Sequence, residues 1–343
     1  MKTTTHEDNN AAIYSLSDNA EAVKSITILI LGAGGLGCEI IKDLAFMGFE
    51  HIHIIDMDTI ELSNLNRQLL FSEKDIGEYK ATVAANTIRD WFPNSEITAH
   101  TSRIEEKDIY FYTNFDIIIS GLDSITARRW MNETIMQLYQ QQGIQIPFID
   151  GGTEGFKGHA RVICAGITGC FECNIDMFPP QKAYPICTLA NTPRLPEHCV
   201  QYVLKQEWED KRSGVVFDSD NQEHIQWVYE RAKLRGNSFG IEGITLFFTL
   251  GVAKNIIPAI ASTNAIISAV CANEALKLAL GYATLDNFMM YNGESSVYSY
   301  AFKVEKNEEC IVCSQLTRIM QLTFSNTLQD ILDNLKDLYF SFM

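Results

Sequence analysis

Residues 25–37 read SITILILGAGGLG, an apolar run followed at once by a glycine-rich loop. The run predicts a buried strand over 25–31, and apolar residues recur at helical spacing after the loop until Gly48 ends the helix. A strand, a G-x-G-x-x-G loop and a helix in this order are typical of a nucleotide-binding turn. The loop glycines let phosphates approach backbone N–H groups at the start of the helix: Gly32, Gly34, Gly35 and Gly37.

A second predicted strand, over 51–56, ends in an acid. This residue, Asp56, follows the loop by about 20 residues, the spacing at which a carboxylate binds ribose hydroxyls. A nicotinamide or flavin enzyme would carry the same loop and the same acid. These features therefore predict a nucleotide site without choosing the nucleotide.

The segment 56–68, DMDTIELSNLNRQ, is dense in polar residues where a dehydrogenase usually continues with a helix. Arg67 offers a guanidinium fork for phosphate, and Asn64 and Gln68 are placed to hydrogen-bond it. Lys80 adds a second cation, and Asp123, after a predicted strand over 116–120, offers a carboxylate for magnesium. Such groups around a nucleotide favour phosphate chemistry over hydride transfer.

Helical patterns separate most of the predicted strands, which continue at 147–150 and 159–165. This alternation predicts an α/β fold with a mostly parallel, doubly wound sheet. Prolines crowd the region from 179 to 196 and predict an irregular crossover, with helices from Pro196 and over 222–233. The apolar stretch 251–281 predicts one buried helix that returns the chain to the first domain.

Four cysteines form two C-x-x-C pairs far apart in the chain: Cys170, Cys173, Cys310 and Cys313. Together they supply four soft ligands for tetrahedral zinc. Zinc joining such distant segments implies that the chain between them is an insertion. Two unrelated redox or incidental C-x-x-C turns remain the alternative.

The composition limits the cellular compartments and the binding partners that the protein could have. Apolar residues make up 46% of the chain without a run long enough to cross a bilayer, and the polar, acidic start does not resemble a signal peptide. Nine cysteines, an odd number, argue against a disulfide framework and favour a reducing compartment, hence the cytoplasm or nucleus. The net charge of −16 disfavours nucleic acid and suits a basic protein partner. We expect neither a membrane nor a nucleic-acid partner.

Three of these motifs together resemble the adenylating domain of ubiquitin-like modifier activating enzymes and their bacterial relatives: GAGGLG at 32–37, DxDxIxxSNLNRQ at 56–68 and SGLD at 120–123. Further strings resemble the catalytic subunits of neddylation activating enzymes, within the ubiquitin-activating enzyme family. They are DGGTEGFKG at 150–158, YPICTLA at 184–190, PRLPEHC at 193–199, EHIQW at 223–227 and IPAIASTN at 257–264. The resemblance covers about 25–320.

The resemblance implies ATP-dependent activation of a modifier of the Nedd or Rub type. The C-terminal glycine of the modifier would be adenylated at the glycine-rich loop, with Arg67, Lys80 and Asp123 as catalytic residues. Cys187 would capture the acyl group as a thioester for a conjugating enzyme, and Arg161 would test the tail of the modifier. The residues implied to bind ATP or Mg²⁺ are the four loop glycines, Asp56, Asp58, Asn64, Arg67, Gln68, Lys80 and Asp123.

The same resemblance implies a division of the chain. Residues 1–24 would be a flexible lead-in, 25–180 and 258–314 a Rossmann-like adenylation domain with the zinc site, and 181–257 an inserted, mainly helical catalytic-cysteine domain. Residues 315–343 would begin a truncated C-terminal ubiquitin-fold domain. No arginine precedes Arg67, whereas self-sufficient bacterial relatives supply one across a dimer. We therefore expect a heterodimer with a regulatory subunit.

Three alternatives remain at this point. The catalytic subunit of a SUMO-activating enzyme has the same cysteine pairs, but PRLPEH, EHIQW and the lack of a basic C-terminal tail weigh against it. A zinc-containing nicotinamide oxidoreductase or a non-catalytic scaffold would belong to other classes. Within the insertion, we expect Cys199 to serve packing and His198 to be a solvated residue at a helix start.

Overall fold

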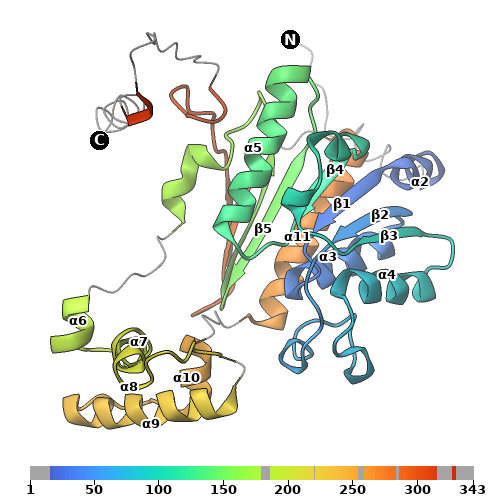
Figure 1. Ribbon diagram of the computed structural model, residues 1–343. Coiled ribbons are helices and arrows are strands. Elements are labelled where there is room, and N and C mark those ends of the chain that lie inside the picture. Colours follow the sequence, from blue (N-terminus) through green and yellow to red (C-terminus); the bar gives the residue numbers. More distant parts are fainter. Residues whose placement is uncertain are drawn as a thin grey trace.

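The computed structural model describes residues 16–178, 186–219, 221–253, 259–282, 286–314 and 327–329. It contains an eight-stranded sheet in the order β3-β2-β1-β4-β5-β6-β7-β8, with helices on both faces (Figure 1). The predicted doubly wound α/β fold is confirmed. The central strands are parallel, and the chain adds an antiparallel extension at one side.

The parallel strands are β1 (Thr27–Leu31), β2 (His51–Ile55), β3 (Glu96–His100), β4 (Ile117–Ser120) and β5 (Phe148–Glu154). The antiparallel strands are β6 (Lys157–Ile163), β7 (Phe288–Asn292) and β8 (Tyr298–Phe302). The sequence did not predict β3, β7 or β8. Strands β3 and β7 are only partly buried and β8 is almost fully exposed, whereas the central strands β1 and β4 are buried along nearly their whole length.

Helices α3 (Gly35–Phe46), α4 (Lys80–Trp91) and α11 (Ala261–Ala279) cover one face of the sheet, and α5 (Ile125–Gln142) covers the other (Figure 1). Strand β1 shows why both faces are apolar. Ile28 and Ile30 pack towards α3, whereas Leu29 and Leu31 pack towards α5, and all four are fully buried. Short 3-10 helices connect these elements: η1 (Leu62–Asn64), η2 (Glu73–Asp75), η3 (Ile104–Glu106), η4 (Ile109–Asn114) and η5 (Glu172–Met177).

A group of helices between β6 and α11 forms a third hydrophobic core, at the lower left of Figure 1. It consists of α6 (Ile186–Asn191), α7 (Pro196–Tyr202), the π-helix η6 (Val203–Glu207), α8 (Trp208–Lys211), α9 (Gln222–Phe239) and α10 (Leu246–Ala253). Trp208 lies in this core with its ring against Trp227, and its indole N–H donates to the carbonyl of Val215 at 2.8 Å. Pro196 occupies the first turn of α7, as predicted.

The prediction of one helix over 251–281 is wrong. Helix α10 ends at Ala253 and packs on α7 and α9, whereas α11 begins at Ala261 and packs on α3 and β5. Ile260 has extended backbone angles, φ −100° and ψ 123°. Pro258 in the sequence lacks the N–H that a continuous helix requires. The apolar composition correctly indicated burial, but it hid a change from one hydrophobic core to another.

The predicted flexible lead-in is wrong for its last residues, because helix α2 (Leu16–Ser25) packs on the sheet layer through Val23. Lys24 also pairs with Glu50 at 2.9 Å. The predicted boundaries near 180 and 258, and most of 315–343, lie outside the described residues, so the proposed division stays a prediction.

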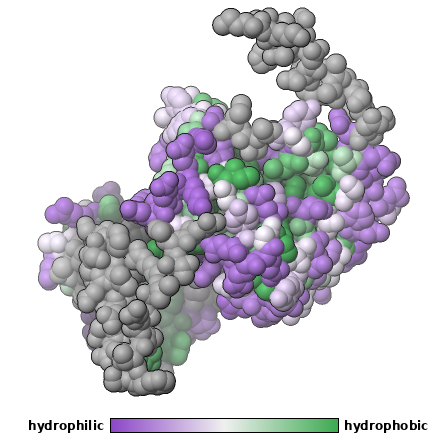
Figure 2. Space-filling model, turned by 90° about the horizontal axis from the view of Figure 1, so that it is seen from above, coloured by the Kyte–Doolittle hydropathy of each residue, from purple (hydrophilic) through white to green (hydrophobic). Residues whose placement is uncertain are grey.

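None of the described helices combines the length and apolar character needed to cross a bilayer. The face seen in Figure 2 is mostly hydrophilic, with apolar side chains gathered in patches.

Candidate nucleotide and metal sites

The carboxyl ends of three strands meet at one edge of the sheet. Leu31, the last residue of β1, is level with Ile55 of β2 on one side and with Ser120 of β4 on the other. The residues that follow these strands therefore emerge together, at the point where the strand order reverses. Open α/β sheets bind their ligands in this crevice.

The loop after β1 contains glycines of two kinds. Gly32 has a positive φ of 92°, and a Cβ at Gly37 would lie 2.0 Å from the carbonyl oxygen of Gly32, so both are needed for the turn itself. Gly34 is different, because a Cβ there would meet no protein atom within 4 Å. Gly34 leaves space at the N-terminus of α3, where first-turn N–H groups favour an anion.

Asp56 follows β2 and is fixed against this loop. One carboxylate oxygen accepts a hydrogen bond from the N–H of Ala33 at 2.6 Å, and the other accepts from the N–H of Asp58 at 2.8 Å. Burial raises the pKa of Asp56, although both N–H donors and Lys80 oppose the shift. The carboxylate is thus held at the edge of the loop, where the sequence predicted a ribose contact.

The two predicted cations come from different segments beside the loop. Lys80, the first residue of α4, is buried, and its Nζ lies 2.8 Å from the carboxylate of Asp58. Arg67 donates from Nη1 to the carbonyl of Ser63 at 2.9 Å, and its side chain packs beside Gly35. Both cations therefore border the loop, with Asp58 as the partner of Lys80.

The two predicted amides, Asn64 and Gln68, are buried. Asn64 accepts a hydrogen bond from the N–H of Glu61 at 2.9 Å, which caps η1. Gln68 is 3% exposed, and its carbonyl oxygen has no hydrogen-bond partner. The structure thus gives Asn64 a local role and leaves Gln68 with an unused acceptor; a nucleotide contact for either residue stays a prediction.

Asp123 is exposed in the connection between β4 and α5. This connection runs against the glycine-rich loop, because a Cβ at Gly121 would lie 3.1 Å from the backbone N of Gly37. A single carboxylate beside bound phosphates is a common way of holding Mg²⁺. Asp123 therefore fits the predicted magnesium ligand in its chemistry and its place.

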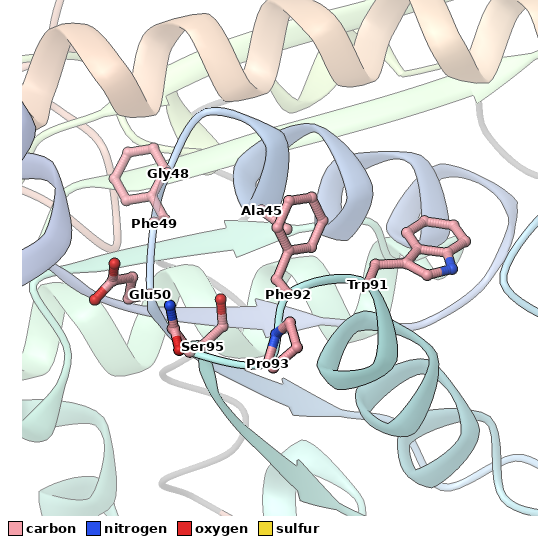
Figure 3. Close-up of a pocket in the computed structure, with 9 residues that line it drawn as sticks. Ala45, Gly48, Phe49, Glu50, Trp91, Phe92, Pro93 and Ser95 are labelled. Carbon is pink, nitrogen blue, oxygen red and sulfur yellow. The ribbon is translucent and has the colours of Figure 1, made fainter.

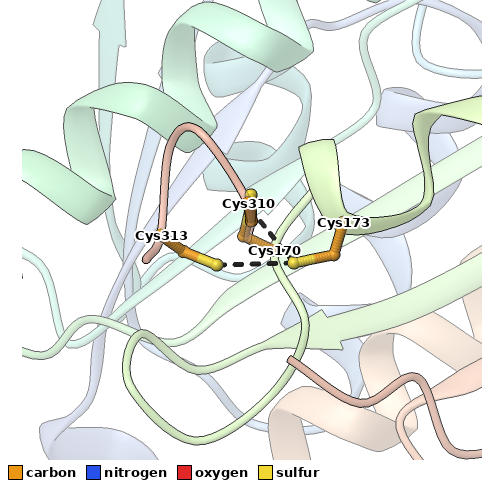
Figure 4. A group of neighbouring side chains, drawn as sticks. All are labelled: Cys170, Cys173, Cys310 and Cys313. Carbon is orange, nitrogen blue, oxygen red and sulfur yellow. Dashed lines mark hydrogen bonds between the residues drawn. The ribbon is translucent and has the colours of Figure 1, made fainter. Parts of the chain in front are cut away.

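The four predicted zinc ligands come together (Figure 4). The sulfur atoms of Cys170 and Cys310 are 3.6 Å apart, those of Cys173 and Cys313 are 3.4 Å apart, and all four lie within 4.8 Å of one another. Tetrahedral zinc–thiolate geometry with bonds of about 2.3 Å requires sulfur separations of about 3.8 Å. The backbone N–H of Asn307 also donates to the sulfur of Cys173 at 3.4 Å. The cluster fits structural zinc.

A hollow of about 230 Å³ lies near the start of β2, at the end of this strand that is opposite to Asp56 (Figure 3). It is lined by Phe49, Phe92 and Pro93 among others, and its titratable residue, Glu50, pairs with Lys24. Glu50 directly precedes β2, whereas Asp56 directly follows it. The hollow is therefore separate from the nucleotide edge.

Comparison with known proteins shows which family combines this fold with these sequence motifs. Residues 8–312 match the ThiF family. The chain belongs to the ThiF family. It is 49% identical over 333 residues to the Nedd8-activating enzyme E1 catalytic subunit of Drosophila melanogaster, covering 94% of this chain and 74% of the relative. It is 50% identical over 323 residues to the NEDD8-activating enzyme E1 catalytic subunit of Dictyostelium discoideum, covering 90% of this chain and 73% of the relative.

The ThiF-family fold also appears in a solved structure. The crystal structure of E. coli MccB with MccA-N7isoASN matches 87% of this chain and 69% of its own, with a TM-score of 0.55 and 19% identity. This likeness concerns the fold.

The predicted catalytic cysteine, Cys187, lies in α6, and its side chain is outside the described part of the structure. The end of α6 is firmly held. Arg235 of α9 donates from Nη2 to the carbonyls of Leu189 and Ala190 at 2.7 and 2.6 Å. Its guanidinium also stacks on Tyr202 at 3.6 Å. The segment that carries Cys187 is thus attached to the helical insertion.

Two neighbouring residues of α7 belong to the interior. Cys199 is fully buried in the third core, which agrees with its expected packing role, and burial raises the pKa of its thiol. The prediction that His198 is solvated is wrong. His198 is 5% exposed, and its Nδ1 accepts a hydrogen bond from the N–H of Arg194 at 3.1 Å.

Arg161 lies inside the protein in this structure. Its guanidinium makes two hydrogen bonds of 3.1 Å to Asp150, is 3% exposed, and lies 4.2 Å from the centre of the Phe171 ring. A buried, fully engaged arginine presents no surface to a modifier tail, so its role in selectivity stays a prediction without structural support. The sequence-based prediction gave Arg161 a contact with the modifier tail and missed its partner Asp150 across β5 and β6.

Two further residues near the site were missed. Arg128 of α5 is buried beside Asp150, and Asn264 of α11 lies against Gly35, where its Nδ2 would be 2.5 Å from an added Cβ. Thr153 donates to the carbonyl oxygen of Asn264 at 2.7 Å. The only sequence signal for this packing was the glycine itself, since a polar helix residue does not reveal which loop it meets.

Proposed function

We propose that this chain is the catalytic half of an ATP-dependent activating enzyme for a ubiquitin-like modifier of the Nedd8 type. Its similarity to named NEDD8-activating catalytic subunits over most of the chain supports this function. The observation that carries the chemistry is the convergence of the Gly34 opening, the fixed carboxylate of Asp56 and the Lys80–Asp58 pair at one sheet edge. The relatives do not favour a SUMO-activating subunit or a nicotinamide oxidoreductase.

In the first half-reaction, a carboxylate oxygen of the modifier attacks the α-phosphorus of ATP, and the bond to the β-phosphate breaks. The products are an acyl-adenylate and pyrophosphate. Asp56 would bind the ribose, and the N–H groups at the start of α3 would face the phosphates. Arg67 and Lys80 would offset the negative charge that develops, and Lys80 must then share its ammonium between Asp58 and the nucleotide. Magnesium, held by Asp123, would neutralise phosphate charge when bound.

In the second half-reaction, the thiolate of Cys187 attacks the acyl carbon and AMP leaves. The product is a thioester, which another thiol can accept by the same chemistry. A conjugating enzyme would then receive the modifier. A regulatory subunit would complete the enzyme, as the relatives named catalytic subunits imply.

The decisive experiment is ATP–pyrophosphate exchange by the full chain, co-purified with its partner, in the presence of candidate modifiers. Exchange that depends on a Nedd8-type modifier is the expected result. Exchange without any modifier, or none with any modifier while ATP binds, would contradict the proposed function. The chain without its partner should give much weaker exchange.

The two kinds of glycine predict opposite effects. Gly37→Ala should lower the free energy of unfolding by about 2 kcal/mol, because the new methyl group meets the backbone of Gly32. Gly34→Ala should leave stability within about 0.5 kcal/mol. It should nevertheless weaken ATP binding by about tenfold, because the methyl group occupies the approach to the phosphates. Denaturant unfolding measures the change in stability of each variant, and calorimetric ATP titration measures the change in affinity. A Gly34→Ala protein with normal ATP affinity would show that the phosphates do not bind beside Gly34.

The cysteine cluster predicts one zinc ion per chain. Cys173→Ser should lose the metal and unfold at a lower temperature, because zinc binding joins the segment after β6 to the segment after β8. Cys164→Ser is the matched control, since Cys164 lies near β6 but outside the cluster. Elemental analysis of protein purified without chelators measures the metal. Wild-type protein without zinc would refute the assignment.

A further inference from the structure

The guanidinium of Arg128 lies beneath the connection that carries Asp123. The residue is 6% exposed, and Nε and Nη2 donate to the carbonyl oxygen of Leu122 at 3.1 and 2.6 Å. Nη2 also donates to the carbonyl oxygen of Gly151 in β5 at 3.0 Å. Leu122 directly precedes Asp123. One planar fork therefore fastens the backbone beside the candidate magnesium ligand to the neighbouring strand.

The arginine is itself held from several sides. Asp150 is fully buried, with one carboxylate oxygen 3.5 Å from Nε of Arg128, and Nε2 of His159 lies 3.4 Å from Nη1. The strand makes room for the fork at Gly152, where a Cβ would lie 2.7 Å from Nη2. A lysine ammonium has three donors but only one nitrogen, so it could at most replace Nη2 and would lose the contacts that Nε and Nη1 make with Leu122, Asp150 and His159.

A buried ion pair is weak support for a stability role alone, because apolar side chains of similar volume often stabilise a core as well or better. Here the donors of the buried arginine end on backbone beside an exposed acid at the ligand edge of the sheet. We infer that Arg128 is a positioning residue, which sets the Asp123 connection so that its carboxylate meets magnesium bound to the nucleotide. This inference rests on the proposed adenylation.

The test compares ATP binding with excess Mg²⁺ and with EDTA, by calorimetry on the full chain co-purified with its partner. Magnesium should tighten ATP binding to the wild type. Arg128→Lys keeps the charge opposite Asp150 but loses the fork, so it should reduce this magnesium-dependent gain by about tenfold. Affinity in EDTA should not change. Asp123→Asn should lose the same gain, and the double variant should lose no more.

Arg129→Lys is the matched control. Arg129 is the next residue of α5, is half exposed, and directs its fork at Glu172, away from the Asp123 connection. It should retain the full effect of magnesium. Equal weakening of Arg128→Lys with and without magnesium, or no weakening, would overturn the inference, as would additive losses in the double variant.

Thermal unfolding separates positioning from folding. If Arg128→Lys does not fold, Arg128→Gln, whose amide still donates one hydrogen bond, decides the question by the same titration. If neither variant folds, Arg128 is required for folding rather than for positioning Asp123, and the inference fails. A wild-type protein that binds no ATP under either condition would instead refute the proposed function.

Discussion

Cys187→Ser is expected to abolish the thiol-sensitive modifier adduct while leaving modifier-dependent pyrophosphate exchange within about twofold of wild type. In the proposed mechanism the two half-reactions use different parts of the chain. The candidate nucleotide residues follow β1, β2 and β4, whereas Cys187 lies in α6, whose end is fastened to α9. Parallel exchange assays and non-reducing gels measure the two steps. A serine hydroxyl is too weak a nucleophile to replace the thiolate at a comparable rate.

Two control variants show whether the loss is specific to the thioester step. Asp123→Ala should lose both signals, because without adenylate there is nothing for the thiol to capture. Cys199→Ala should keep both, because Cys199 is a packing residue of the third core. A Cys187→Ser protein that still forms the thiol-sensitive adduct would place the nucleophile elsewhere.

Asp150→Asn is expected to lower the free energy of unfolding by about 3–5 kcal/mol. Its carboxylate is fully buried between Arg128 and Arg161, and its removal leaves two buried guanidinium groups without their anion. Burial alone would raise the pKa of Asp150, but the two arginines outweigh it and hold the pKa well below the ordinary range. The stabilisation is therefore present above the unfolded-state pKa of about 4 and is lost as the pH falls towards the folded-state value.

Denaturant unfolding at pH 7 and at successively lower pH measures this contribution. Glu294→Gln is the control, because its pair with Lys157 is exposed on both sides and should contribute less than about 1 kcal/mol. The difference between wild type and Asp150→Asn should shrink in acid. A loss below about 1 kcal/mol at pH 7 would mean that the two arginines do not depend on Asp150.

The sequence predicted those features that a local pattern controls. The glycine-rich loop was visible because Gly32 and Gly37 satisfy constraints within one turn, and Asp56 because it ends a buried strand. The cysteine cluster was predictable from ligand chemistry, since each C-x-x-C pair is a preformed half-site. The structure brings all of these to the expected places.

What could not be predicted depends on contacts between segments distant in sequence. Nothing in the sequence shows that Arg161 pairs with Asp150, which only the register of β5 and β6 places opposite it. Arg128 reads as one of two adjacent helix arginines, and only packing separates the buried one from its exposed neighbour. The stretch 251–281 looks uniformly apolar because two different cores use it, one for each helix.

The separation of the three hydrophobic cores affects which part of the protein would unfold first. In the described part of the chain, the core around Trp208 shares no buried residue with the two that flank the sheet. Mild heat or a single defect in the helical group can therefore loosen it while the sheet keeps its shape. Under the proposed function, such a protein would still form the acyl-adenylate at the sheet edge but would have no positioned thiol to capture it. Each site would then hold one unused adenylate, and the modifier would not pass to a thioester.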